Sequence, residues 1–238
     1  QSFADSESQI DFLKMHGIGT SKKIKCLGKG SFGGINFNEI EKNISIDDKK
    51  QISTEFDIPQ DMPWAIFIGR VTKDKGVIDL INAYRLINDK SVCRLVIVGQ
   101  LEQELDPIPH DILNEITTNE RIHFLGFQTN PIKFLNASDF LILPSYREGF
   151  ATVIIEAAAC MRPTIGTKIP GITDPIIHNQ TGLLFDKFDI ETLASYIKEY
   201  SSNNKLRLLH GENAYQNCKN NYDYISISNL LIKQYNEI

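Results

Sequence analysis

The chain has 238 residues, of which 42% are hydrophobic and 23% are charged, which is ordinary for a globular protein with a full core. Its formal net charge of −5 argues against a dedicated nucleic-acid-binding protein. No apolar run approaches the roughly 20 residues that span a bilayer. The four cysteines lie far apart without metal-ligand spacing, so we expect no metal site, buried free thiols at Cys93 and Cys160, and a reducing, cytoplasmic setting.

The first 62 residues have weak and irregular patterns. Apolar residues at helical spacing predict a helix over 5–16, and a short strand follows over 23–27. The glycine-dense stretch 28–36 matches neither of the common nucleotide-binding glycine motifs, so we interpret it as a hinge or crossover. Residues 38–62 are polar and acidic and are typical of a connector, with one weak helix over 48–55.

From Trp64 onward the chain alternates strands and helices. Six apolar runs predict buried strands, over 64–68, 92–99, 122–125, 140–143, 163–166 and 182–185. Helical spacing predicts helices between and after them, over 77–87, 108–117, 132–136, from Thr152, and over 172–178, 190–201, 204–219 and 224–236. Short connections between alternating strands and helices indicate an α/β protein with a doubly wound, Rossmann-like parallel sheet of about six strands.

Several charged residues follow the predicted strands directly. Ligands of an open parallel sheet bind beyond the carboxyl ends of its strands, so Arg70, Lys75, Glu148 and Glu156 can converge there. Arg70 and Lys75 offer a guanidinium fork and a point charge to the oxygens of a diphosphate. Thr152 is predicted to be a helix N-cap, and amides at a helix start favour phosphate.

The two glutamates suit hydroxyl groups rather than phosphates. Glu156, one turn inside its helix, could accept hydrogen bonds from two vicinal hydroxyls of a ribose. Glu148, in the preceding turn, could accept from a second sugar, and Gly149 lets the backbone approach that sugar. Each residue also has an ordinary interpretation, because a glutamate early in a helix usually complements the helix dipole and loop cations are usually solvated. Their joint placement at strand ends is what favours a site.

The stretch from Glu148 to Glu156 resembles the motif of glutamate, seven residues and glutamate found in retaining glycosyltransferases of family 4, which have the GT-B fold. Further similarity to that family lies at Gly69-Arg70, Lys75-Gly76, Val98-Gly99, Leu125-Gly126-Phe127, Pro144-Ser145, Pro170-Gly171-Ile172 and Thr181-Gly182-Leu183-Leu184-Phe185. The resemblance covers roughly residues 64–200. The run 145–148 is similar to the branch that builds bacterial capsular and other surface polysaccharides.

This resemblance implies a nucleotide-diphosphate-sugar donor, usually UDP-linked, and transfer with retention of configuration to a glycan or lipid-linked acceptor. No cofactor and no obligatory metal are implied, because Arg70 and Lys75 would stabilise the leaving diphosphate. Glu148 would hold the transferred sugar and Glu156 the ribose, so that Glu148, Arg70 and Lys75 form the implied catalytic set. The other implied donor-binding positions are Gly69, Gly99, Phe127, Gly149, Phe150, Ala151, Thr152 and Val153. Ala151 departs from the Gly or Pro that is frequent there in the family.

The resemblance also implies a domain arrangement, because GT-B enzymes have two Rossmann-like domains and only one complete sheet is predicted. We expect residues 1–45 to be a remnant of the N-terminal domain plus hinge and residues 46–221 to be the nucleotide-sugar-binding domain. Residues 222–238 would form a C-terminal helix that crosses back toward the N-terminal domain. The chain alone would then be inactive, with the missing domain as its partner. The full-length protein would be cytoplasmic, or peripheral at the inner face of the cell membrane.

Two alternatives remain open from the sequence. One is a different GT-B enzyme, such as a sugar-nucleotide epimerase or a glucan synthase. The other is a non-catalytic nucleotide-binding module with a decayed site, although all four proposed ligand residues are present.

Overall fold

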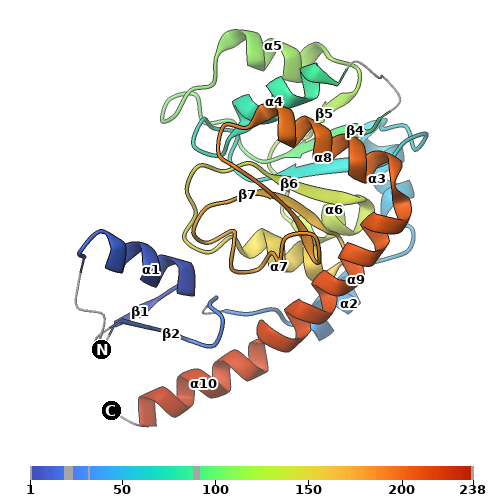
Figure 1. The fold of residues 1–238 in the computed structure, drawn as a ribbon. Coiled ribbons are helices and arrows are strands. Elements are labelled where there is room, and N and C mark those ends of the chain that lie inside the picture. Colours follow the sequence, from blue (N-terminus) through green and yellow to red (C-terminus); the bar gives the residue numbers. More distant parts are fainter. Residues whose placement is uncertain (1, 19–23, 32, 88–91, 237–238) are drawn as a thin grey trace.

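The main body of the protein is a six-stranded parallel sheet, seen in a computed structural model that describes residues 2–18, 24–31, 33–87 and 92–236 (Figure 1). Its strands are β3 (Trp64–Ile68), β4 (Arg94–Val98), β5 (Ile122–Phe124), β6 (Phe140–Leu143), β7 (Thr164–Thr167) and β8 (Gly182–Phe185). They lie in the order β5-β4-β3-β6-β7-β8, which is the 3-2-1-4-5-6 order of doubly wound dinucleotide-binding sheets. The predicted fold class is confirmed, and the strand order places its switch point between β3 and β6.

Helices cover both faces of this sheet (Figure 1). One face packs against α4 (Val77–Leu86), α5 (His110–Thr118) and α8 (Ile190–Ser202). The other packs against α2 (Phe37–Asn43), α3 (Asp48–Phe56), α6 (Pro131–Ala137), α7 (Thr152–Ala159) and α9 (Asn204–Asn221). Alternate strand residues serve alternate faces: Ala65 and Phe67 lie in the first core, and Trp64 and Ile66 in the second. Burial on both faces explains why the central strands β3, β4 and β6 are almost continuous apolar runs.

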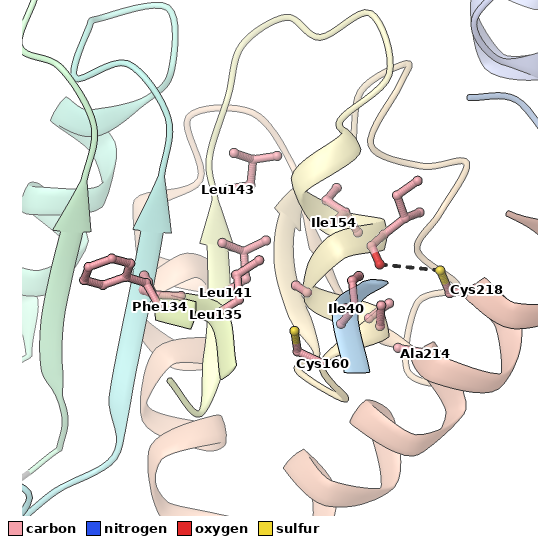
Figure 2. Close-up of a cluster of buried hydrophobic side chains, with 14 of the residues drawn as sticks. Ile40, Phe134, Leu135, Leu141, Leu143, Ile154, Cys160, Ala214 and Cys218 are labelled. Carbon is pink, nitrogen blue, oxygen red and sulfur yellow. Dashed lines mark hydrogen bonds between the residues drawn. The ribbon is translucent and has the colours of Figure 1, made fainter. Parts of the chain in front are cut away.

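Figure 2 shows part of the second core, where strand and helix side chains meet. Ile40 of α2 lies beside Ile154 of α7 and two residues of α9, Ala214 and Cys218. The Cys218 thiol donates a hydrogen bond of 3.4 Å to the Ile155 carbonyl oxygen. Cys93 and Cys160 are buried free thiols, as predicted, and burial raises their pKa values to about 11 and about 12.

A smaller unit lies beside the six-stranded sheet (Figure 1). It contains β1 (Ser2–Ala4) and β2 (Ile24–Cys26), which pair in parallel, and α1 (Glu7–Met15). The last helix, α10 (Tyr224–Asn236), extends from α9 toward it, and residues 25–28 share a small cavity with residues of α10. Ile35 links the parts, because its N–H donates to the Tyr222 carbonyl at 2.7 Å and its carbonyl accepts from Tyr224 N–H at 3.0 Å. The domain boundaries at 45 and 222 stay predictions.

Several local predictions were wrong. Strand β1 and helix α2 were not predicted; α2 begins where the Asn36 side chain accepts from Glu39 N–H at 3.2 Å. The predicted helix over 172–178 is a series of turns, since Pro175 has no N–H and disfavours helix in the residue before it. Thr152 is the first residue of α7 rather than its N-cap, which is Ala151. The predicted strand over 23–27 begins at Lys23, outside the described residues.

Within the described ranges, none of the helices has the length and apolar character needed to cross a membrane.

Candidate functional site

Backbone hydrogen bonds join neighbouring loops at the carboxyl edge of the sheet. Gly69 N–H donates to the Val98 carbonyl at 3.0 Å, and Gly99 N–H to the Gly126 carbonyl at 2.8 Å. Gly76 adopts a left-handed conformation (φ 70°), and a Cβ added to it would collide with the Pro144 carbonyl oxygen. Glycine at position 76 therefore lets the loop after β3 touch the end of β6, at the switch point of the sheet.

Lys75 and Glu148 form the centre of this edge. Lys75 Nζ lies 2.8 Å from Glu148 Oε1, and their side chains are only 18% and 13% exposed. The two residues come from loops after different strands and are separated by more than seventy positions in the sequence. The expected convergence of this pair is confirmed. A largely buried carboxylate requires such a partner, because an unpaired charge there would be poorly solvated.

Arg70 is held close by, but by other carboxylates. Its guanidinium donates to Glu102 at 3.0 Å and to Asp74 at 3.3 Å, and its side chain is 46% exposed. Asp74 also accepts from Thr72 Oγ1 at 2.6 Å and from Arg147 Nε at 3.3 Å. Burial alone would raise the pKa of Asp74, but these hydrogen bonds and the nearby positive charges outweigh it, and the pKa is lowered. Arg70 thus neighbours the Lys75–Glu148 pair through Asp74 rather than by contact.

Sequence reasoning missed Asp74, Glu102 and Arg147 as parts of this network. The available signal was position, since Asp74 lies four residues after Arg70 and Glu102 lies in the loop after β4. It also missed a second link at the same edge. Burial of Asp79 among the apolar residues of α4 raises the pKa of its carboxyl, and the Tyr146 hydroxyl hydrogen-bonds to it.

The turn after Glu148 is held by its backbone. Gly171 lies so close that a Cβ there would collide with the Gly149 carbonyl oxygen, and Ala151 N–H donates to the Gly171 carbonyl at 3.1 Å. The Phe150 ring packs on Tyr222 at 5.5 Å between centroids, and Ala151 is 3% exposed. The Ala151 side chain is therefore buried and the Phe150 side chain is half-buried against Tyr222.

Glu156 lines a different cavity from Glu148. This cavity, of about 530 Å³, is lined by Glu156, by residues 33–36 of the predicted hinge and by residues 129–132. Burial raises the pKa of Glu156. Glu148 instead lines a cavity of about 520 Å³ together with Tyr146 and Arg147 of its own turn and with residues of α1. The structure thus brings Lys75 and Glu148 into contact, while Glu156 lines another cavity and its expected convergence with that pair is not seen.

The remaining predicted positions are spread along the edge. Phe127 follows β5 and is 70% exposed. Thr152 is exposed and Val153 half-buried at the start of α7. Thr152 N–H donates to the Phe150 carbonyl at 2.9 Å, so this amide is engaged within the turn. The ligand roles of all these residues stay predictions.

Helix α1 closes one side of the Glu148 cavity, a contact that sequence reasoning did not anticipate. Gln9 Nε2 donates to the Gly149 carbonyl at 2.6 Å. Ser8 N–H donates to Asp174 Oδ1 at 3.0 Å, and Ser8 Oγ accepts from Gly171 N–H at 2.9 Å while donating to Asp174. Two turns of the large unit, around Gly149 and Gly171, are thereby joined to α1.

Comparison with known proteins gives one family match and a set of relatives. The family described as "Glycosyl transferases group 1" matches residues 48–217. The capsular polysaccharide biosynthesis glycosyltransferase CapM of Staphylococcus aureus is 30% identical over 237 residues, covering 98% of this chain and 60% of that protein. N-acetyl-alpha-D-glucosaminyl L-malate synthase of Bacillus anthracis is 28% identical over 191 residues, covering 80% and 49%. The chain spans about half to three-fifths of the length of these relatives.

Solved structures of similar fold include Alr3699/HepE of Anabaena in complex with UDP and glucose. It superposes with a TM-score of 0.85 at 20% identity, over 99% of this chain and 63% of that one. A glycosyltransferase from Rickettsia africae has a TM-score of 0.85 at 22% identity, over 99% and 62%. At this level of identity the likeness establishes a shared GT-B-type fold.

Proposed function

Because the chain belongs to the glycosyl transferases group 1 family, we propose that it is the donor-binding part of a retaining glycosyltransferase that uses a UDP-sugar. The observation that carries this proposal is the Lys75–Glu148 pair at the switch point of the sheet, 2.8 Å apart and largely buried. Switch points are where ligands of doubly wound sheets bind. A cation and a carboxylate side by side there match a donor that has both a diphosphate and a sugar.

In the proposed reaction, the incoming diphosphate takes over part of the positive charge of Lys75. Arg70, 46% exposed and already placed at this edge, adds a guanidinium fork. The two cations stabilise the charge that develops on the leaving diphosphate, without an obligatory metal. Glu148, released from part of its pairing, accepts hydrogen bonds from the hydroxyls of the transferred sugar.

Glu156 is assigned to the ribose of the nucleotide. Its raised pKa reports a carboxyl group that lacks solvation. Two ribose hydroxyls would supply the hydrogen bonds that stabilise its charged form. The UDP and glucose in the HepE complex support a UDP-linked donor, on the strength of a shared fold.

The acceptor is proposed to be a glycan or lipid-linked molecule of surface polysaccharide synthesis. The capsular name of the S. aureus relative supports this class. So does a Campylobacter jejuni relative, 25% identical over 233 residues, whose name specifies an undecaprenol-linked acceptor. The apolar residues Phe12, Leu13 and Ile169 on the wall of the Glu148 cavity suit an acceptor with an apolar part. We propose that a further N-terminal domain supplies the other wall, in the cytoplasm or at the inner membrane face.

Calorimetric titration of the chain with UDP, GDP and ADP, and with their sugars, tests donor binding. We expect UDP to bind in the presence of EDTA. Glu156→Gln should weaken UDP itself by about tenfold, as expected for a lost charged hydrogen bond. Glu148→Gln should leave UDP almost unchanged and weaken the UDP-sugar. Glu191→Gln, at an exposed position of α8, is the matched control. Equal loss of UDP binding in both site variants contradicts the assigned roles, and binding of no nucleotide contradicts the proposal.

A separate experiment tests whether sugar transfer requires a second domain. We expect the 238 residues alone to transfer little or no sugar, because one wall of the catalytic cleft is proposed to come from another domain. Rapid turnover by the isolated chain overturns that proposal. Product analysis with the longer protein separates transfer from epimerisation or glucan synthesis.

A further inference from the structure

Another cavity, lined by polar and charged side chains, lies at the opposite edge of the sheet, where the strands begin. It has a volume of about 360 Å³. Its walls are the loop before α3 and the first turn of that helix, the C-terminal end of α6 with the residues before β6, and Arg162 before β7. Since the proposed donor site lies beyond the carboxyl ends of the strands, this cavity is separate from it.

Arg162 has more hydrogen-bond donors than the protein uses. Its Nη2 donates to the Asn136 carbonyl oxygen at 2.8 Å, which caps the end of α6. Its Nε is buried and has no hydrogen-bond partner among the described residues. A guanidinium has five N–H donors; the buried Nε is closed to a ligand, so the Nη donors that do not cap α6 are the ones that a ligand can reach. Burial also lowers the pKa of Arg162, only partly offset by the charge of Asp139, which means that its positive charge is poorly compensated.

The nearby carboxylates are already bound by other groups. Asp139 accepts from Lys49 Nζ at 2.7 Å and from Trp64 N–H at 2.8 Å, and Arg207 lies 3.5 Å away. Asp48 accepts from Ser45 N–H and Asn136 Nδ2, each at 2.8 Å. Among the residues that line the cavity, two cations, Lys49 and Arg162, face one carboxylate, Asp139, which leaves one positive charge in excess.

We propose that this cavity is a binding site for a small oxyanion of the phosphate class, held by Arg162 and Lys49. An oxyanion neutralises the excess charge and gives the Arg162 guanidinium the acceptors that it lacks. A cation would be repelled by the excess charge, and a neutral ligand would leave it uncompensated. The bound anion would lie next to the C-terminal end of α7, the helix that carries Glu156.

The experiment follows the arginine Nε–Hε signals of the chain by NMR during titration with inorganic phosphate. The background variant Arg70→Met/Lys75→Met removes the cations of the proposed donor site, so that phosphate there does not contribute. We expect the Arg162 signal to shift in a saturable way, and sodium chloride at equal ionic strength to leave it in place. A shift that grows linearly, or an unchanged signal, overturns the proposal.

Variants of the site sharpen the test. Lys49→Met should weaken phosphate binding by about tenfold, as for one lost charged hydrogen bond. Lys50→Met, at the adjacent exposed position of α3, should not change it. Arg162→Lys keeps the charge without the fork and should also weaken binding, with folding checked by circular dichroism. Equal affinity in the Lys49 and Lys50 variants overturns the assignment of Lys49 and Arg162 as ligands.

Discussion

The turn that carries Glu148 and the helix that carries Glu156 place their glutamate side chains in opposite electrostatic surroundings. Glu148 is 13% exposed and meets a cation, Lys75, at 2.8 Å. Glu156, further along the chain inside α7, loses solvation by burial, and its pKa is raised for that reason. The charged form of Glu148 is stabilised by Lys75 from another loop, whereas the charged form of Glu156 is destabilised by burial. Spacing along the sequence therefore does not determine the chemistry of either glutamate.

The difference arises from the elements that surround each residue. The Glu148 turn is pressed against the loop after β3, where Gly76 allows contact with Pro144. Helix α7 instead packs its small residues against α9. Glu156 lines a cavity together with residues 33–36. A ligand with an anionic group for Lys75 and hydroxyl donors for Glu148 suits the first position, and a ligand that brings hydroxyl donors alone suits the second.

The largest expected effect comes from removing the close approach that holds the Glu148 turn. Gly76→Ala should lower the free energy of unfolding by about 3 kcal/mol or more, because the added methyl collides with the Pro144 carbonyl oxygen. Gly126→Ala is the matched control: Gly126 has a similar φ of 65° but open space around it, so the cost should be about 1 kcal/mol. Urea unfolding of both variants measures the difference. Equal losses would mean that backbone conformation, and not the contact, determines the cost.

The second-largest effect is expected from breaking the Lys75–Glu148 ion pair. Lys75→Met leaves Glu148 without its cation at 13% exposure and should cost about 2 kcal/mol of stability. The double variant Lys75→Met/Glu148→Gln should recover most of this loss, because the carboxylate no longer needs a partner. A double-mutant cycle from urea unfolding gives the coupling energy between the two residues. A coupling energy near zero would show that the pair is not electrostatically linked.

Glu156 predicts an effect that depends on pH. The folded pKa lies above the ordinary value of 4.5, so protonation of Glu156 favours the folded state. Its contribution to stability is fully present below 4.5 and is lost as the pH rises through the raised folded pKa. Glu156→Gln should therefore be more stable than the wild type at neutral and higher pH, and the advantage should disappear as the pH falls below 4.5.

Thermal unfolding of both proteins across this range measures the effect. The exposed Glu191→Gln change should give no such pH dependence. A Glu156→Gln variant that is less stable than the wild type at neutral pH would mean that Glu156 has a stabilising partner.

How far the fold could be predicted depended on burial. The central strands β3, β4 and β6 are almost continuous apolar runs, so their pattern identified them to within a few residues. β1 is three residues long and α2 is seven, too short for periodicity to be visible. The convergence of Lys75 with Glu148 followed from the geometry of parallel sheets. The Arg70–Glu102 and Tyr146–Asp79 contacts did not, because they depend on which of several nearby side chains meet.

The smallest effect on stability is expected from removing an exposed charge, Arg147, which lies next to the buried charge of Glu148 in the same turn. Arg147 pairs with Asp74 at 3.3 Å, but its side chain is 80% exposed. Water and salt screen such a pair, so Arg147→Ala should change the free energy of unfolding by less than about 0.5 kcal/mol. Its immediate neighbour Glu148 is bound by Lys75 at much lower exposure, and Glu148→Ala should cost several times more because Lys75 would lose its partner. Urea unfolding of the two adjacent variants compares them directly. Equal costs would show that burial does not distinguish the two charges, and the contrast between the Glu148 turn and the α7 helix would then require another cause.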